Sequence, residues 1–195
     1  MRRQVVGQVL GAWVAVIMIM GLGLWVATAE PEGTSKPTEQ VDAARAVATH
    51  NRLRASVGAP PLVWDPKLAT FAQEWADELK RRGCDLKHRP RQGGFSQRYG
   101  ENLYWGSAVL FADGRRRSAS TTTLEKVILG WASERAFYDA NNHTCASGKA
   151  CGHYTQIVWS ATKRVGCGWA KCEDLSQVWV CNYDPPGNVL GRRPF

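Results

Sequence analysis

The sequence has few of the features that mark non-globular chains. Only 9 of its 195 residues are proline, and 44% are hydrophobic against 22% charged, a composition that excludes disordered, collagen-like and multi-span membrane chains. Acidic residues are also scarce, 17 against 25 Lys and Arg, so the formal net charge is +8. Apart from Arg115-Arg116-Arg117 the basic residues are scattered, and we therefore expect no nucleic-acid partner.

The common catalytic motifs are missing as well. The chain contains no H-E-x-x-H, no G-x-S-x-G and no G-x-x-x-x-G-K, and the absence of any C-x-x-C pair argues against zinc fingers and ribbons. What remains for chemistry is a small set of histidines and carboxylates. Considered one at a time, each is better explained by a structural or surface role: His50, His88, His143, His153, Glu101 and Glu134.

Residues 1–29 are typical of a secretory signal peptide. Two early arginines precede an uncharged apolar run at 9–26, Ala27-Thr28-Ala29 is an A-x-A cleavage site, and a polar linker occupies 30–37. The alternative is an uncleaved anchor, because the run is nearly long enough to cross a bilayer. In either case we expect the rest of the chain to be exported, as a secreted protein or as an envelope protein if the source is bacterial. Cleavage would leave it without a stable membrane span.

All six cysteines lie beyond the signal. An even count in an exported chain predicts three disulfides, which leaves no thiol to act as a nucleophile. Spacing alone does not choose among the possible pairings. Most of the cross-links are expected in the C-terminal third, since five of the six cysteines fall there: Cys84, Cys145, Cys151, Cys167, Cys172 and Cys181.

Three helices are predicted in the first part of the exported chain. Apolar residues recur at helical spacing over 39–57. Asp65 is a natural N-cap for a second helix, which has proline at its first position and Gly83 at its end. The capping box Thr122-x-x-Glu125 opens a third helix that reaches Glu134.

The rest of the exported chain is predicted to be loops and short strands. Residues 88–120 are loop-rich, and β-branched and aromatic residues predict strands at His153–Trp159, Val165–Ala170 and Val178–Tyr183. Helices followed by strands that cysteines connect indicate one α+β domain over residues 38–195. We expect a monomer.

Four stretches of this domain carry recognisable motifs: His50-Asn51-x-x-Arg54, Gly100–Leu103, Gly152–Trp159 and Val180–Asn188. Together they resemble the CAP superfamily, which comprises cysteine-rich secretory proteins, antigen 5 and pathogenesis-related class-one proteins. Within the superfamily the sequence resembles the secreted plant and bacterial members most. The third stretch matches the first family signature in full. Trp179, just before the fourth stretch, departs from the family preference for a smaller apolar residue.

The resemblance implies a three-layer α-β-α sandwich with a small, three-stranded antiparallel sheet and a large surface cleft. It also implies the disulfide pairing Cys84–Cys172, Cys145–Cys151 and Cys167–Cys181. Matched motif by motif, the two histidines and two glutamates of the family cleft correspond to His88, His153, Glu101 and Glu134. His50 and His143 are outside this set and are interpreted as a packing residue and a loop residue.

Two hypotheses follow for the cleft. In the first, His88 and His153 bind one divalent ion, most plausibly zinc, with Glu101 and Glu134 as partners of the histidines or of bound water. In the second, protonated histidines pair with the glutamates and no metal is needed. No other cofactor is expected.

The resemblance favours a secreted binding module for lipid, sterol or cell-wall components, with a defence or envelope role. One alternative is a metal-assisted hydrolase or a glycosidase that uses Glu101 and Glu134 as catalytic carboxylates. Another is a precursor that releases a C-terminal signalling peptide after Asn182-Tyr183-Asp184. The long, basic segment Ser107–Ser120 is either a solvated insertion or a contact for an anionic surface.

Overall fold

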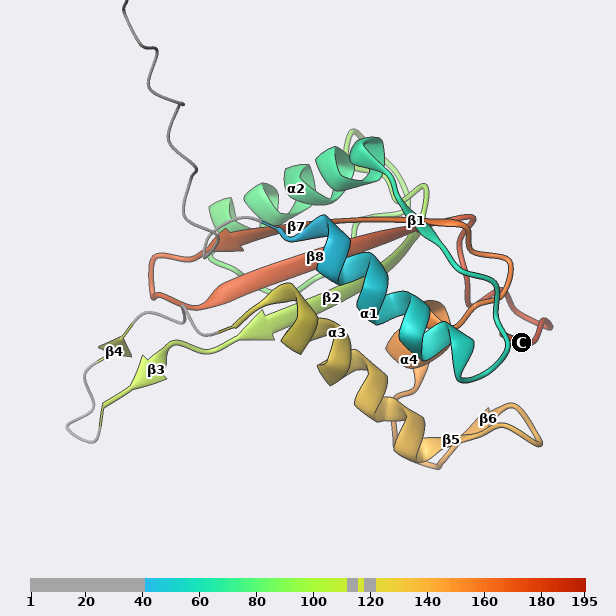
Figure 1. The fold of residues 1–195 in the computed structure, drawn as a ribbon. Helices are drawn as coiled ribbons and strands as arrows, with labels where there is room; N and C mark the ends of the chain where they lie inside the picture. Colours follow the sequence, from blue (N-terminus) through green and yellow to red (C-terminus); the bar gives the residue numbers. More distant parts are fainter. Residues whose placement is uncertain (1–40, 112–115, 118–121) are drawn as a thin grey trace, which may run out of the picture. The chain divides into compact units, whose positions relative to one another are not determined.

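The core of the molecule is a four-stranded sheet with helices on both faces (Figure 1). The computed structural model describes residues 41–111, 116–117 and 122–195, so the predicted signal and linker lie outside the described residues. β7, β8 and β2 are antiparallel, which is the three-stranded core that the family resemblance implies, and a short β1 adds in parallel to β7. In the order of the sheet the strands are β1 (Val63–Trp64), β7 (Arg164–Lys171), β8 (Gln177–Asp184) and β2 (Gly100–Gly106).

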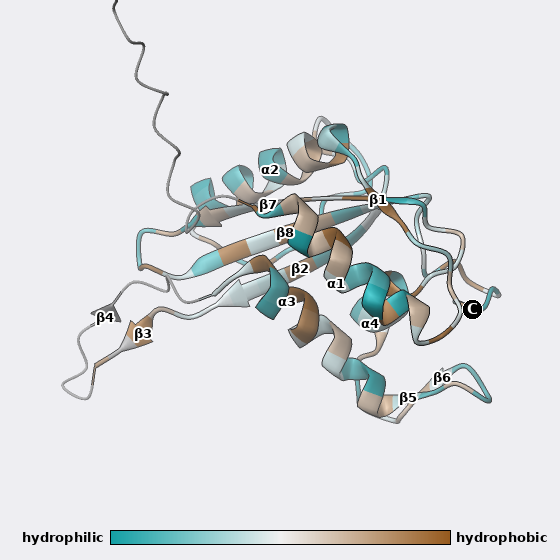
Figure 2. Cartoon of the chain, viewed as in Figure 1, coloured by the Kyte–Doolittle hydropathy of each residue, from teal (hydrophilic) through white to brown (hydrophobic). Residues whose placement is uncertain are grey.

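The helices divide between the two faces of the sheet because side chains alternate along each strand. On β8, Val178 and Val180 pack under α2, whereas Trp179 and Cys181 face the opposite way, toward the other helices. The fold is therefore the expected α-β-α sandwich, and in Figure 2 each helix carries both hydrophilic and hydrophobic residues. The helices are α1 (Ala43–Ala55), α2 (Pro66–Arg81), α3 (Leu124–Ala132) and α4 (Gly152–Ile157).

The second helix lies unusually close to the sheet. The predicted cap is confirmed: the carboxylate of Asp65 accepts from the backbone N–H groups of the first turn of α2. Gly166 and Gly168 of β7 then allow the close approach. A Cβ at Gly166 would lie 2.1 Å from the backbone nitrogen of Ala69, and one at Gly168 would lie 2.5 Å from the Cα of Gln73. Any larger residue at these two positions would push the layers apart.

The third helix begins one residue later than predicted. Thr123, in extended conformation, is the N-cap and its hydroxyl accepts from the N–H of Lys126, so the expected capping box at Thr122 is wrong. The α-helix also ends earlier, because a 3-10 turn, η1 (Ser133–Phe137), follows Ala132. This turn carries Glu134.

Two secondary-structure predictions are corrected by the structure. The stretch His153–Trp159 is not a strand, since its first part forms α4. Tyr154 and Ile157 are buried on one face of this helix, and Glu134 accepts from backbone N–H groups at its start. In turn, the region predicted as loop contains β2, which pairs with β8 along its whole length.

The disulfide pairing implied by the family resemblance is confirmed. Cys84–Cys172 connects the end of α2 to the end of β7, Cys167–Cys181 joins directly opposed residues of β7 and β8, and Cys145–Cys151 closes a short loop before α4. No cysteine is free. A cysteine nucleophile is thereby excluded from the chemistry of the site.

Arg54 on α1 is a buried charge with no exposed surface. Its guanidinium donates hydrogen bonds to five backbone carbonyls, those of Pro60, Ile157, Trp159, Ser160 and Thr162. Five donors in a fixed plane suit this set of acceptors, which no other side chain could satisfy. The residue therefore connects α1 to the loop that follows α4.

The unusual Trp179 is accommodated by a second indole. Trp169 lies opposite it in the register of β7 and β8, and the two rings stack at a centroid distance of 5.4 Å and an angle of 18°. Trp179 is 5% exposed and its indole N–H donates to Gln177 Oε1. The large side chain of Trp179, where the family prefers a smaller residue, is therefore packed in a cross-strand aromatic pair.

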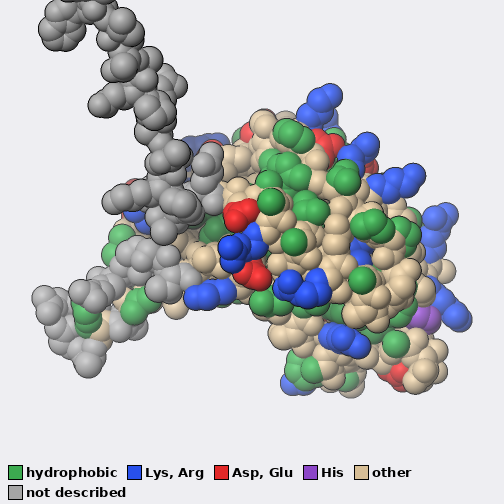
Figure 3. All heavy atoms as spheres, in the orientation of Figure 1, with side chains coloured by type: hydrophobic (Ala, Val, Ile, Leu, Met, Phe, Trp, Pro, Cys, Tyr) green, Lys and Arg blue, Asp and Glu red, His purple; other side chains and the backbone are tan. Residues whose placement is uncertain are grey.

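The surface of the described residues shows no concentration of one charge in the view of Figure 3, where Lys and Arg side chains are spread over the face. Within the basic segment Ser107–Ser120, β3 (Val109–Leu110) pairs with β4 (Arg116–Arg117), and the rest of that segment is described only up to Phe111. None of the helices that the structure describes combines the length and apolar character needed to cross a membrane.

Candidate functional site

The first half of the candidate site lies between the loop after α2 and the start of β2. Glu101 Oε1 accepts hydrogen bonds from His88 Nδ1 at 2.8 Å and from the backbone N–H of Arg89 at 3.0 Å. Asn182 Nδ2 lies 3.4 Å from the other carboxylate oxygen. The Glu101 side chain is fully buried, whereas that of His88 is 54% exposed. The imidazole is therefore the part of this pair that faces solvent.

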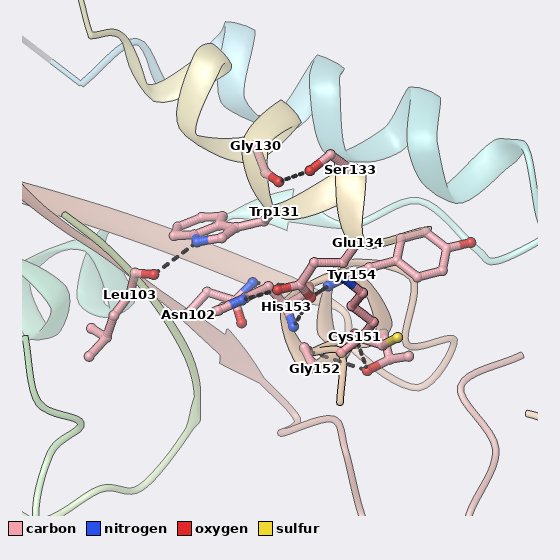
Figure 4. Close-up of polar contacts among 12 residues, drawn as sticks. Asn102, Leu103, Gly130, Trp131, Ser133, Glu134, Cys151, Gly152, His153 and Tyr154 are labelled. Carbon is pink, nitrogen blue, oxygen red and sulfur yellow. Dashed lines mark hydrogen bonds and ion pairs between the residues drawn. The ribbon is translucent and has the colours of Figure 1, made fainter. Parts of the chain in front are cut away.

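The second half joins η1 to α4 (Figure 4). His153 Nδ1 donates to Glu134 Oε1 at 2.6 Å, and Glu134 Oε2 accepts from the backbone N–H groups of His153 and Tyr154 at 2.9 and 3.2 Å. The indole of Trp131 stacks on the imidazole of His153, with the two ring centroids 6.0 Å apart. Figure 4 also shows that indole donating to the carbonyl of Leu103 on β2. The ring of His153 is thus held from two directions.

The two halves are connected through β2, the edge strand of the sheet. Asn102 Nδ2 donates to the carbonyl of His153 at 3.1 Å, and its neighbour Glu101 belongs to the first pair. Glu101 and Asn102 are consecutive residues of β2, so this strand contacts both pairs. All four residues named from the family motifs therefore meet partners at the start of β2, as two separate His–Glu pairs.

His50 has the packing role that the sequence analysis predicts. It has no exposed surface, its Nδ1 donates to the carbonyl of Ala46 at 2.8 Å, and its Nε2 accepts from the hydroxyl of Tyr183 at 3.1 Å. Burial lowers the pKa of His50 to about 4, so the ring is neutral at physiological pH. Asn102 also donates to the Tyr183 hydroxyl, which extends the network from α1 to the site.

His143 is a loop residue, as predicted, in the turn between β5 (Tyr138–Asp139) and β6 (Thr144–Cys145). Its Nδ1 is 3.0 Å from the hydroxyl of Tyr138, and its ring contacts that of Phe195. The C-terminal residue is thereby packed against the domain. His143 takes no part in either His–Glu pair.

The rest of the C-terminal tail is also bonded to the domain. Asn188 bonds to the carbonyl of Gly152 and to the hydroxyl of Thr155, and the carbonyl of Pro194 accepts from the N–H of Ser160. The junction proposed for peptide release ends in Tyr183-Asp184, the last two residues of β8, and Tyr183 is fully buried. A protease would have to open the end of the sheet to reach it.

The chemistry of the donor set suits a weakly held divalent ion. In both pairs Nδ1 contacts a carboxylate, so a neutral imidazole would offer the lone pair of Nε2 to a metal, an arrangement common in metal sites. Among residues 41–111, 116–117 and 122–195 no group of three or more His, Cys, Asp or Glu is arranged to hold a metal. Only the two imidazoles would serve as strong ligands, which leaves coordination positions for water or another ligand.

Two residues that support the site were not identified from the sequence. Asn102 lies inside the G-E-N motif, so the motif itself was the available signal. Arg89 directly follows His88, but its role depends on aromatic rings of α2 and of the loop, which no local pattern indicates.

The fold and the site together define a class of protein. It is an α-β-α sandwich with three disulfides and with two His–Glu pairs beside the edge strand of its sheet. The model of the cysteine-rich secretory protein family, CAP, matches residues 47–183. Pathogenesis-related protein 1C of Nicotiana tabacum is 41% identical over 146 residues, covering 75% of this chain and 76% of that protein. Pathogenesis-related protein PR-1 of Medicago truncatula is also 41% identical, covering 74% of each. The chain belongs to the CAP family.

Solved structures agree on the fold. Venom allergen-like protein 4 of Schistosoma mansoni superposes with a TM-score of 0.54 at 27% identity, covering 77% of this chain and 90% of that one. NaASP2, solved with Zn2+, has a TM-score of 0.58 at 22% identity and covers 84% and 90%. The CAP fold is therefore shared with proteins of distant sequence.

Proposed function

We propose that this protein is a secreted CAP protein of the pathogenesis-related type, which acts outside the cell as a binding module and holds one zinc ion between His88 and His153. The observation that carries the metal proposal is that both imidazoles use Nδ1 to donate to a glutamate, so that Nε2 is left for a metal. NaASP2, which shares the fold, has been solved with Zn2+.

An extracellular defence role is supported by two further observations. Three disulfides persist in oxidising compartments and are rare in the cytosol. The relatives that are about 41% identical are named pathogenesis-related proteins. Binding is favoured over a glycosidase because Glu101 is fully buried and both oxygens of Glu134 already accept hydrogen bonds, so neither is poised to act on a substrate.

Calorimetric titration with zinc tests the metal proposal. At about pH 7.5 we expect one zinc ion per chain, and at about pH 5.5 weaker uptake, because zinc binds neutral imidazole. The double variant His88→Ala/His153→Ala should lose the signal, while His143→Ala, a matched control in a histidine outside the site, should keep it. Undiminished uptake by the double variant would exclude this site. No uptake by the wild type would favour a metal-free network of histidines and glutamates.

The ligand of the binding module is proposed to be a lipid or cell-surface component with negative charge. Support comes from the β3–β4 hairpin, where Val109, 43% exposed, lies opposite Arg117 in the register and Leu110 lies opposite Arg116. Apolar and basic residues on one hairpin suit an anionic membrane surface.

Vesicle sedimentation tests this ligand class. The protein should bind vesicles that contain phosphatidylserine more than vesicles of phosphatidylcholine alone, and Arg116→Gln/Arg117→Gln should weaken that binding at least several-fold. The control Arg192→Gln/Arg193→Gln removes the same charge from two exposed residues of the tail. Equal loss in both variants would indicate a non-specific charge effect and contradict a role for the hairpin. Addition of sterol to neutral vesicles measures whether the apolar part alone is sufficient.

A further inference from the structure

The loop after α2 contains a second deeply buried cation, Arg89, which the proposed function does not use. Its side chain is 1% exposed, and the guanidinium carbon lies 3.6 Å from the ring centroid of Phe71, 5.4 Å from that of Trp75 and 5.9 Å from that of Phe95. Its Nη2 donates to the carbonyl of Phe71. The three rings stabilise the charge by cation–π contact, but a cation at this depth also needs a carboxylate.

The carboxylate that Arg89 faces is Glu101. Arg89 Nε lies 3.7 Å from Oε2, while the backbone N–H of the same residue donates to Oε1 at 3.0 Å. Glu101 is thus contacted by Arg89 at both of its oxygens, and Oε1 is the atom that accepts from His88. The other acidic neighbour, Glu74, is 4.0 Å away and 56% exposed, so solvent screens it. Burial lowers the pKa of Arg89, and the two carboxylates oppose that effect.

The other His–Glu pair is built differently. The carboxylate of Glu134 is held by the backbone N–H groups of His153 and Tyr154, and no Lys or Arg among the described residues lies within ion-pair distance of it. Backbone donors are fixed by α4 itself. In the first pair the loop after α2 supplies a single backbone donor, the N–H of Arg89. The other oxygen of Glu101 is contacted by two side chains, Asn182 Nδ2 at 3.4 Å and Arg89 Nε at 3.7 Å.

We propose that Arg89 is a positioning residue, which holds the carboxylate of Glu101 against His88 so that Nδ1 keeps its proton and Nε2 is presented to a ligand. The zinc readout of this inference rests on the proposed function, but the proton position on His88 does not. The inference also explains why a cation is buried beside the site, where a neutral residue would pack among the same rings at lower cost.

The first experiment needs no metal. Long-range proton–nitrogen NMR on apo protein at about pH 8 reports which ring nitrogen of each histidine carries the proton. We expect His88 to be protonated at Nδ1 in the wild type and to shift substantially toward the Nε2–H form in Arg89→Met. His153 should be unchanged and serves as the internal reference. The matched control is Arg82→Met, since Arg82 lies 5.3 Å over the same Trp75 ring but pairs with Glu78.

The second experiment is the zinc titration on the same variants. Arg89→Met should weaken zinc binding about tenfold or more, the range typical when a partner of a metal-binding histidine is lost, and Arg82→Met should not. Both variants keep the backbone N–H of residue 89, and Arg89→Lys also keeps the positive charge, so partial retention of both signals is expected for Arg89→Lys. If Arg89→Met does not fold, as judged by thermal unfolding, Arg89→Lys supplies the comparison with wild type.

The outcomes separate the two proposals. A folded Arg89→Met variant in which the His88 proton stays on the same ring nitrogen would overturn the positioning role, whatever the result of the zinc titration. Absence of zinc uptake by the wild type would contradict the metal proposal alone, since the NMR result still decides the role of Arg89. Equal effects of Arg89→Met and Arg82→Met would show that loss of any cation near the Trp75 ring is sufficient, and would also overturn the inference.

Discussion

The hydroxyl of Tyr183 donates to Nε2 of His50 in the fully buried centre of the domain, at a distance of 3.1 Å. The same hydroxyl accepts from Asn102, so one oxygen joins α1, β8 and β2. Tyr183→Phe removes that oxygen and leaves the ring nitrogen of His50 without a donor. We expect a loss of about 1–3 kcal/mol in the free energy of unfolding, measured by urea denaturation. A variant as stable as wild type would show that the hydroxyl is dispensable.

Acid should destabilise the domain through His50. Its folded-state pKa of about 4 lies below the ordinary value of 6.5, so the unfolded chain takes up the proton first as the pH falls. The contribution of neutral, buried His50 to the free energy of unfolding is complete above about pH 6.5 and is lost progressively as the pH falls to about 4. At about 1.4 kcal/mol per pH unit, the total loss is about 3 kcal/mol. Urea unfolding across this range measures it. His50→Gln lacks the effect, and wild-type and variant curves that fall in parallel would contradict the prediction.

A substitution of Arg54 tests how much the five backbone carbonyls around its guanidinium (the carbonyl cage) stabilise the domain. Lysine has only three donors for the five carbonyls, so Arg54→Lys leaves buried acceptors without partners. We expect a loss of about 2–4 kcal/mol, against at most about 0.5 kcal/mol for Arg52→Lys, a control on the exposed face of the same helix. Equal effects on the unfolding midpoint would show that the cage contributes little.

Glu134 is expected to raise the affinity for zinc through its hydrogen bond to His153, and not only through its negative charge. Glu134→Gln keeps the shape but weakens the acceptor for His153 Nδ1, and zinc affinity should fall about tenfold or more by calorimetry. Glu125→Gln is the control, because Glu125 lies on α3 and pairs with Arg45 and Arg52 of α1, away from the site. Loss of binding in the control as well would assign the effect to net charge.

The disulfides should differ in how much they stabilise the domain. Cys84–Cys172 spans 88 residues and Cys145–Cys151 only 6, so the entropy removed from the unfolded chain is larger for the first. Replacement of the first pair by alanine should lower the free energy of unfolding by about 4 kcal/mol and of the second by about 2 kcal/mol. Equal losses in denaturant titrations would contradict this account.

Local chemistry explains which parts of the fold were predictable. The cap at Asp65 was correct because the carboxylate bonds within its own turn. The β-branched and aromatic residues from His153 to Trp159 predict a strand, yet α4 forms there. Glu134, nineteen residues earlier, accepts the N–H of His153, and the Cys145–Cys151 disulfide lies just before the helix. Propensity is a weak signal when such tertiary contacts oppose it.

The sequence by itself determined the cysteine set, the helix cap of α2 and, through its motifs, the four residues of the candidate site. Tertiary structure decided how those four residues pair, since His88 meets Glu101 and His153 meets Glu134 only when a loop, a strand edge and two short helical segments come together. It also decided that Arg89 contacts this site, because its cation is buried among rings of α2 and the loop. Such contacts depend on packing between segments distant in the chain, which motifs and periodicity do not encode.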